Sequence, residues 1–233
     1  MNANMNYDEI IRRLEGAAAP EAVKWMASYG ITPERAYGVK IPELRTIAKE
    51  CGRNRSLAKR LWANDTRETR ILASMIDEPA KVTEKQMDNW ALCFDYWEIV
   101  DQCCMNLFEK TPFAAAKAVE WSGRPEEYVK RAGFVLMARL AVSDKRAPDS
   151  LFEGFLPLIE MESDDDRNMV KKGVNWALRQ TGKRNLRLHG KALAASRRIH
   201  ARGTKSARWI ASDALRELES DAVVSRLKSR SGV

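Results

Sequence analysis

The sequence predicts an all-α protein of about a dozen helices joined by short loops. Three observations support this fold class. Helix start and stop signals recur from end to end, and no run of four or more residues is typical of a strand. The chain has only 12 Gly and 8 Pro among 233 residues, too few for the turns of an all-β sandwich or barrel. A hydrophobic share of 45% and a charged share of 31% are typical of a globular protein. We expect one domain over residues 1–233, with flexible ends at about 1–6 and 229–233.

The first helices are bounded by proline and glycine. Pro20 is expected to open a helix that Gly30 ends, and Pro42 to open IPELRTIAKE, which Gly52 ends. Proline suits the first helical turn, and glycine suits the residue after the last turn. Further along, Thr83–Gln86 has the spacing of a capping box.

Two helix starts are predicted in the middle of the chain. Asp95 and Glu98 form an Asp-x-x-Glu start for the helix DYWEIVDQCCMNLF. Thr111 and Pro112 are expected to be the N-cap and first residue of a helix that Gly123 ends.

The last third carries three further signals. Pro157 lies within LFEGFLPLIE and should kink or end that helix. Thr204 precedes SARWIASDALRELE, and Asp221 precedes AVVSRLKS. Both residues are suited to the start of a helix.

Four helical stretches align around a basic residue, and a small or apolar face follows each time. The aligned residues are Arg70, Arg131, Lys172 and Arg208. The last three are 41 and 36 residues apart, whereas the first gap of 61 is longer than one repeat and shorter than two. A period near 40 is typical of HEAT and armadillo units, which stack into a curved α-solenoid because one helix pair cannot bury its own apolar face. We therefore predict a solenoid of HEAT-like (armadillo-type) repeats with a concave basic groove.

The charge is concentrated in the second half of the chain. The net charge is +8, from 40 basic and 32 acidic residues. Residues 1–123 hold 17 basic and 18 acidic side chains, whereas residues 124–233 hold 23 and 14. From residue 167 to residue 210 there are 13 Lys or Arg and no Asp or Glu. A stretch of one sign favours contact with nucleic acid, although a plain basic surface is the alternative.

Several classes of site are excluded by their missing motifs. There is no GxxxxGK[ST], GxGxxG, HExxH or GxSxG, and two histidines are too few for a histidine-based triad. The four cysteines lack metal-site spacing, which predicts reduced thiols in a cytoplasmic protein with no metal and no cofactor. They are Cys51, Cys93, Cys103 and Cys104. No apolar run approaches a membrane span, and the start lacks the core of a signal peptide, so no membrane contact is expected.

Two pairs of residues are candidates for chemistry. Trp97 and Asp101 are spaced i, i+4 and share a helix face, as do Lys172 and Trp176. In a curved solenoid both pairs could line one side with Arg131 between them, and the two indoles would approach each other. The alternatives are ordinary packing of the tryptophans and an ion pair between Asp101 and the next repeat.

Four motifs resemble one family. YGVKIPELRTIAKE, FDYWEIVDQ, YVKRAGFVLM and VKKGVNWALRQTGKRN are similar to the alkylpurine DNA glycosylases of the AlkD-type DNA alkylation repair family, over about Ile31 to Leu218. The resemblance implies an all-helical stack of HEAT-like repeats that holds duplex DNA in a basic groove. It also implies hydrolysis of the N-glycosidic bond of cationic N3- and N7-alkylated purines.

The resemblance assigns four catalytic positions. Its first Trp falls on Trp97, its carboxylate on Asp101, its Arg on Arg131 and its second Trp on Trp176. Glu98 stands where the family pattern has Asp, and we expect it mainly to cap the helix. Basic residues of the repeats and of the acid-free stretch, residues 167–210, are expected to contact DNA phosphates. These are Arg70, Lys172, Arg179, Lys183, Arg184 and Arg208.

The chemistry fits these residue types. An alkylated purine is already cationic and leaves as a neutral base, so no general acid is needed. A carboxylate stabilises the positive charge that develops on the sugar, and indole faces favour the same cation. Two other functions are open for a monomeric solenoid: a non-catalytic HEAT-repeat scaffold that binds DNA, and a protein-binding solenoid with an acidic partner.

Overall fold

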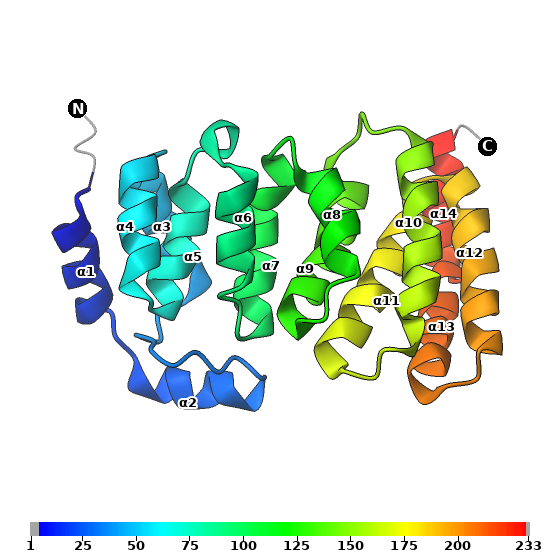
Figure 1. Cartoon of the computed structure of the whole chain (residues 1–233), viewed down its shortest axis with the longest axis horizontal. Helices are drawn as coiled ribbons and strands as arrows, with labels where there is room; N and C mark the ends of the chain where they lie inside the picture. The colour runs from blue at the N-terminus through cyan, green and yellow to red at the C-terminus, as the bar shows by residue number, and fades with distance from the viewer. Residues whose placement is uncertain (1–4, 232–233) are drawn as a thin grey trace. The chain divides into compact units, whose positions relative to one another are not determined.

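The computed structural model describes residues 5–231, and within that range it is all-helical (Figure 1). Fourteen α-helices and three short 3₁₀ turns account for the regular structure, and no strand occurs among these residues. The predicted all-α class is confirmed. Of the ends expected to be flexible, residues 1–4, 232 and 233 lie outside the described residues. Asn6 caps the first helix, and the last helix continues to Ser231.

Contacts between helices divide the chain into two compact units, residues 1–112 and 113–233. The single domain over residues 1–233 therefore stays a prediction, as does a groove that both units would share.

The first unit contains seven helices and two 3₁₀ turns. They are α1 (Tyr7–Gly16), α2 (Pro20–Ser28), α3 (Ile41–Cys51), α4 (Arg55–Asn64), α5 (Arg67–Ile76), η1 (Pro79–Lys81), α6 (Glu84–Ala91), α7 (Trp97–Asn106) and η2 (Phe108–Lys110). Helix α5 is central, because α3, α4 and α7 all pack against it. Its apolar face is wholly buried at Ile71 and Leu72. Full burial of such a side chain stabilises the fold by about 1.5–3 kcal/mol.

The second unit contains seven helices and one 3₁₀ turn. They are α8 (Ala114–Ser122), α9 (Glu127–Ser143), α10 (Asp149–Met161), η3 (Glu162–Asp164), α11 (Asn168–Gly182), α12 (Leu186–Ala201), α13 (Lys205–Leu218) and α14 (Asp221–Ser231). Helix α11 packs against α9 on one side and α13 on the other, while α10 packs against α12 (Figure 1). The unit is thus two layers of helices, with α9, α11 and α13 in one and α10 and α12 in the other.

Several predicted helix boundaries are confirmed. Helix α2 begins at Pro20, and α3 has Pro42 in its first turn and ends at Gly52, whose φ of 65° suits glycine. The Thr204 side chain accepts a hydrogen bond from the Ala207 backbone N–H over 3.2 Å, as expected of an N-cap.

One predicted cap is wrong and one predicted capping box is only half formed, because other groups hold the side chains. Helix α8 begins at Ala114 with Phe113 as N-cap, because the Thr111 hydroxyl donates to the Phe108 carbonyl over 2.8 Å and belongs to η2. At α6, Thr83 accepts from the Gln86 N–H, but the Gln86 side chain bonds Asp77 instead of completing the box.

Pro157 does not end its helix, since α10 continues to Met161. The residue lies on the exposed side of α10. Water therefore reaches the carbonyl that loses its N–H partner, and the helix tolerates the proline there.

Candidate functional site

The aligned basic residues occupy equivalent places in their helices. Arg70, Arg131, Lys172 and Arg208 are each the fourth or fifth residue of α5, α9, α11 and α13. The long gap after Arg70 contains α6 and α7, so it holds one further repeat. The equivalent residue of α7 is Asp101, its fifth residue. A carboxylate therefore stands at the one position of the series that is not basic.

The start of α7 carries an aromatic surface. Trp97 is the first residue of α7, it is half-buried, and its Nε1 donates to the Tyr29 carbonyl oxygen over 2.9 Å. Tyr29 and Trp25 are 56% and 65% exposed, with ring centroids 4.4 Å apart. Asp101, also half-buried, lies one turn after Trp97. Trp25 and Tyr29 were missed in the sequence, although their i, i+4 spacing on a short helix was a signal.

Beneath this surface lies a buried ionic network. Arg67 Nε and Nη2 each donate to Glu98 over 2.7 Å, and Nη1 donates to Glu68 over 2.9 Å. Glu68 also accepts three backbone N–H groups from residues 37–39, over 2.9–3.1 Å. Burial disfavours the charged guanidinium, but the hydrogen bonds and negative charges of Glu98 and Glu68 together outweigh it, and the pKa of Arg67 is raised.

The network corrects the expected role of Glu98. Helix α7 has Tyr96 as N-cap with no side-chain cap, so Glu98 does not cap it. Its carboxylate instead pairs with Arg67, because a buried bidentate guanidinium is a stronger partner than an exposed backbone N–H. Asp95 does not cap α7 either; it lies 3.5 Å from Arg70, and burial raises its pKa.

The same network fixes the start of α2. The Tyr37 carbonyl, in the loop that Glu68 holds, accepts from the Ala19 N–H over 2.7 Å. Gly38 has a φ of 83°, and a Cβ there would lie 2.3 Å from the Ala19 carbonyl oxygen. The loop 37–39 thus connects the start of α2 to the buried network that includes Glu98. The network thereby helps to position Tyr29, at the end of α2, beside Trp97.

Arg70 is mostly engaged within the protein. Its side chain is 13% exposed and pairs with Asp65 and Asp95. Its Nη1 donates to the Cys93 carbonyl over 3.2 Å, and its guanidinium lies 5.4 Å from the Trp62 ring centroid. A DNA phosphate at Arg70 would have to compete with these partners.

In the second unit, Arg131 and Trp176 lie on the packed helices α9 and α11. Arg131 is 6% exposed and donates through Nη1 to the Met169 carbonyl over 2.8 Å. A Cβ on Gly173 would lie 3.6 Å from Arg131 Cγ, so Arg131 supports the first turns of α11. Lys172 is exposed there. Trp176 is half-buried, and with the Gln180 amide oxygen turned toward it, Trp176 Nε1 donates over 3.1 Å.

Most cations of the acid-free stretch form ion pairs with acidic residues from other segments. Arg179 and Lys183 pair with Glu217 of α13, and Arg202 pairs with Asp164 of η3. Hydrogen bonds from Lys183 and Arg179 outweigh burial and lower the pKa of Glu217.

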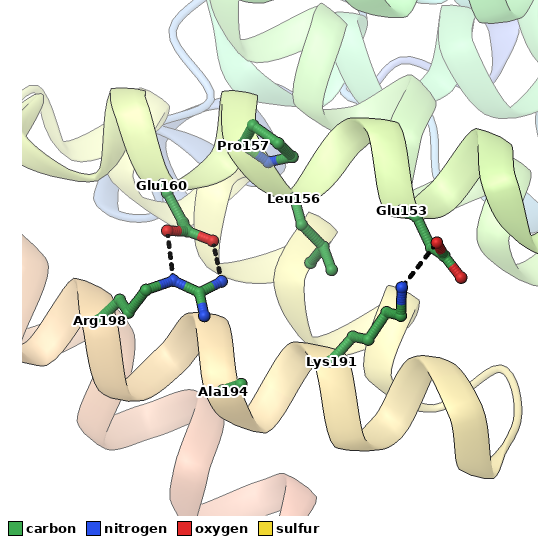
Figure 2. A pocket seen from close by; sticks show the side chains of 7 residues that line it. All are labelled: Glu153, Leu156, Pro157, Glu160, Lys191, Ala194 and Arg198. Carbon is green, nitrogen blue, oxygen red and sulfur yellow. Dashed lines mark hydrogen bonds and ion pairs between the residues drawn. The ribbon is translucent and has the colours of Figure 1, made fainter.

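Basic side chains of α12 pair with carboxylates of α10. Figure 2 shows Glu160 with Arg198 and Glu153 with Lys191, flanking a pocket of about 340 Å³. Leu156, Pro157 and Ala194 complete its lining. No residue predicted to be functional lines this pocket, whose charges are already paired.

A smaller set of cations is left exposed. Lys172, Lys205 and Arg208 are exposed and form no ion pair among residues 5–231. Lys171 Nζ lies 5.0 Å from the ring centroid of Trp209, which is 41% exposed. Trp209 therefore adds an aromatic residue to this basic surface, and sequence analysis missed it.

Arg184 ties the loop after α11 to the end of α9 and the loop that follows α9. It donates to the carbonyls of Ala141 and Ala147 over 3.2 and 2.8 Å. Its guanidinium lies 4.1 Å from the Phe152 ring centroid. Trp97 and Trp176 belong to different units, so their predicted approach stays a prediction.

Comparisons with known proteins agree with the sequence motifs. The family model described as "DNA alkylation repair enzyme" matches residues 10–218. The chain belongs to the DNA alkylation repair family. This confirms the membership that the four motifs predicted.

Two known proteins are similar to this member of the DNA alkylation repair family. The uncharacterized protein Lin0241 of Listeria innocua is 21% identical over 199 residues, covering 84% of this chain and 87% of that protein. A solved structure, described as "A new family of proteins related to the HEAT-like repeat DNA glycosylases with affinity for branched DNA structures", has a TM-score of 0.74 at 20% identity, covering 83% of each chain. The HEAT-like repeat fold is therefore confirmed.

The described residues, 5–231, hold no candidate membrane span and no candidate metal site. None of the helices there is long and apolar enough to cross a membrane. In the same part of the chain, no three His, Cys, Asp or Glu side chains are grouped so as to hold a metal ion.

Proposed function

We propose that this member of the DNA alkylation repair family is a glycosylase that releases cationic N3- and N7-alkylated purines from duplex DNA. One observation carries the proposal: α7 has a carboxylate, Asp101, where the other four helices have a cation, one turn from Trp97. DNA phosphates attract cations, so Asp101 is not a phosphate ligand, and its place beside Trp97 suits a role in the chemistry instead.

The chemistry explains that carboxylate. Cleavage of the glycosidic bond develops positive charge on the deoxyribose, and a fixed carboxylate stabilises it and orients the attacking water. The aromatic surface of Trp25, Tyr29 and Trp97 suits a cationic base through its ring faces. The departing base is neutral, so the reaction needs no general acid.

The exposed cations of α11 and α13 are the best phosphate ligands in this proposal. Lys172 and Arg208 are exposed, and Arg179 and Lys183 share Glu217 and still present donors. Arg131 and Arg70 are largely buried, so we propose that they act by holding helices in place.

The test is release of free base from duplex DNA containing N7-methylguanine, with abasic sites counted in the same sample. The wild type should release base. Asp101→Asn should not, and Asp95→Asn, a matched acid just before α7, should behave as the wild type. Release by Asp101→Asn at the wild-type rate would contradict the proposal.

A second candidate function is binding of branched DNA without catalysis. The solved relative is described as having that affinity. Trp209, which is exposed beside Lys171, suits it, because an exposed indole can stack on unpaired or terminal bases, such as those at a junction. Tighter binding to a four-way junction than to a duplex of equal length, with no base release, would favour this candidate.

A further inference from the structure

A basic pocket lies at the far end of α11 from Lys172. Its volume is about 160 Å³. It is lined by Ala141, Val142, Lys145, Gln180, Lys183, Arg184, Arg226 and Arg230. These residues come from the ends of α9 and α11, the loops after them, and α14. Five of the eight are cationic and none is acidic.

The five cations differ in their partners. Lys183 pairs with Glu217, and Arg184 donates to two carbonyls, so the fold itself explains both. Lys145, Arg226 and Arg230 are exposed and have no ion pair among residues 5–231. Nothing in the fold explains why these three, from two separate segments, meet in one cleft. Like charges held together repel one another unless an anion joins them.

The pocket continues the surface that carries Trp176. Lys172, Trp176, Gln180 and Lys183 follow at i, i+4, i+8 and i+11, which places them along one face of α11. The Gln180 amide oxygen lies 3.1 Å from both Trp176 Nε1 and Lys183 Nζ. A strand that contacts Trp176 therefore has the pocket next along the helix.

We propose that this pocket binds a phosphate group, supplied by the DNA backbone on the side of Trp176 away from Lys172. Two guanidinium groups, Arg226 and Arg230, offer the planar donor pairs that match phosphate oxygens. The volume of about 160 Å³ is large enough for a phosphate group. The assignment to DNA rests on the proposed function, whereas the phosphate chemistry does not.

The experiment compares two triple variants with equal loss of charge. The pocket variant is Lys145→Ala, Arg226→Ala, Arg230→Ala. The control is Arg187→Ala, Lys191→Ala, Arg198→Ala on α12, whose cations are exposed and already paired with Glu153 and Glu160. Duplex affinity is measured from 50 to 300 mM salt, and thermal unfolding is measured with and without inorganic phosphate.

We expect the slope of log affinity against log salt to be less steep by about 0.9 per lost phosphate contact in the pocket variant, and unchanged in the control. Inorganic phosphate should raise the melting temperature of the wild type more than that of the pocket variant. All three substituted side chains are exposed, so melting without phosphate should change little and exclude misfolding.

The other outcomes are distinct. Equal slopes together with equal phosphate effects in wild type and pocket variant would overturn the proposal. A lost phosphate effect with an unchanged slope would overturn the DNA assignment and leave a free phosphate compound as occupant. A phosphate effect in a wild type that binds no DNA would refute the proposed function while supporting the phosphate pocket.

Discussion

Asp101 is the side chain on which the proposed catalysis depends. It lies at the helix position that is basic in α5, α9, α11 and α13, and beside Trp97. If its carboxylate stabilises the charge on the sugar, Asp101→Asn should lower single-turnover release of N7-methylguanine by about 10²–10³, because a preorganised electrostatic group is lost. DNA affinity should be unchanged or slightly tighter, since a negative charge near phosphates is removed.

The same variant separates catalysis from structure. Its thermal unfolding is measured beside the excision assay. Lost excision with a large fall in melting temperature would mean that Asp101 serves an ion pair between repeats.

Arg67 is the residue whose loss should affect stability most. Removing it leaves Glu68 and Glu98 as buried charges without their shared partner, so Arg67→Ala should destabilise the protein by about 3–5 kcal/mol. Urea unfolding measures this. Arg60→Ala is the control, because that side chain is 61% exposed and pairs with Asp8 only at the surface. The control should cost less than about 1 kcal/mol, and equal costs would contradict the role of the network.

The contact between α8 and α9 depends on one glycine. A Cβ on Gly133 would lie 2.5 Å from the Ser122 backbone N and 2.9 Å from the Ala118 carbonyl oxygen, which are backbone atoms that cannot turn aside. Gly133→Ala should therefore destabilise the second unit by about 1–3 kcal/mol, although alanine favours helices. Gly154→Ala on exposed α10 is the control, because nothing lies within 4 Å of a Cβ there. It should be neutral or stabilising in the same urea titration.

The contact between α11 and α13 should depend on pH through Glu217. Lys183 and Arg179 hold the pKa of Glu217 below its ordinary value of 4.5. A carboxylate with a lowered folded-state pKa stabilises the fold above its unfolded value, and this contribution is lost as pH falls through the lowered value. Glu217→Gln should therefore be less stable than the wild type at pH 7, and the difference should shrink as the pH falls below 4.5. A difference that is constant with pH would exclude this ion pair as its source.

Over the whole chain, fewer cations are free to bind a polyanion than the net charge of +8 suggests. Acids of α10, η3 and α13 neutralise much of the stretch from 167 to 210, and the exposed remainder is small. If that remainder and the pocket contact about five phosphates, log affinity should fall with log salt at a slope near −4.5. A slope near zero, or no duplex binding at low salt, would contradict DNA binding by this surface.

The all-helical class and the repeat were predictable from sequence, because both depend on local spacing. Proline, glycine and threonine mark α2, α3 and α13 through the backbone geometry that each residue favours. The motif around Trp97 and Asp101 likewise depends only on neighbours in one helix. The repeat that contains α7 does not show in the pattern of basic residues, because its residue at the aligned position, Asp101, is acidic.

Tertiary structure decided what the charged residues do. Glu98 has the spacing of a helix cap, yet Arg67, 31 positions away, takes its carboxylate into a buried pair. The sequence predicts phosphate contacts for Arg70 and Arg184 and a catalytic role for Arg131, but each is held by carbonyls or acids from other segments. Conversely, Lys145, Arg226 and Arg230 belong to no sequence motif, and only folding brings them together in one pocket. Helix formation depends on residues a few positions apart, whereas the free energy of a charge depends on every group near it, whatever its place in the chain.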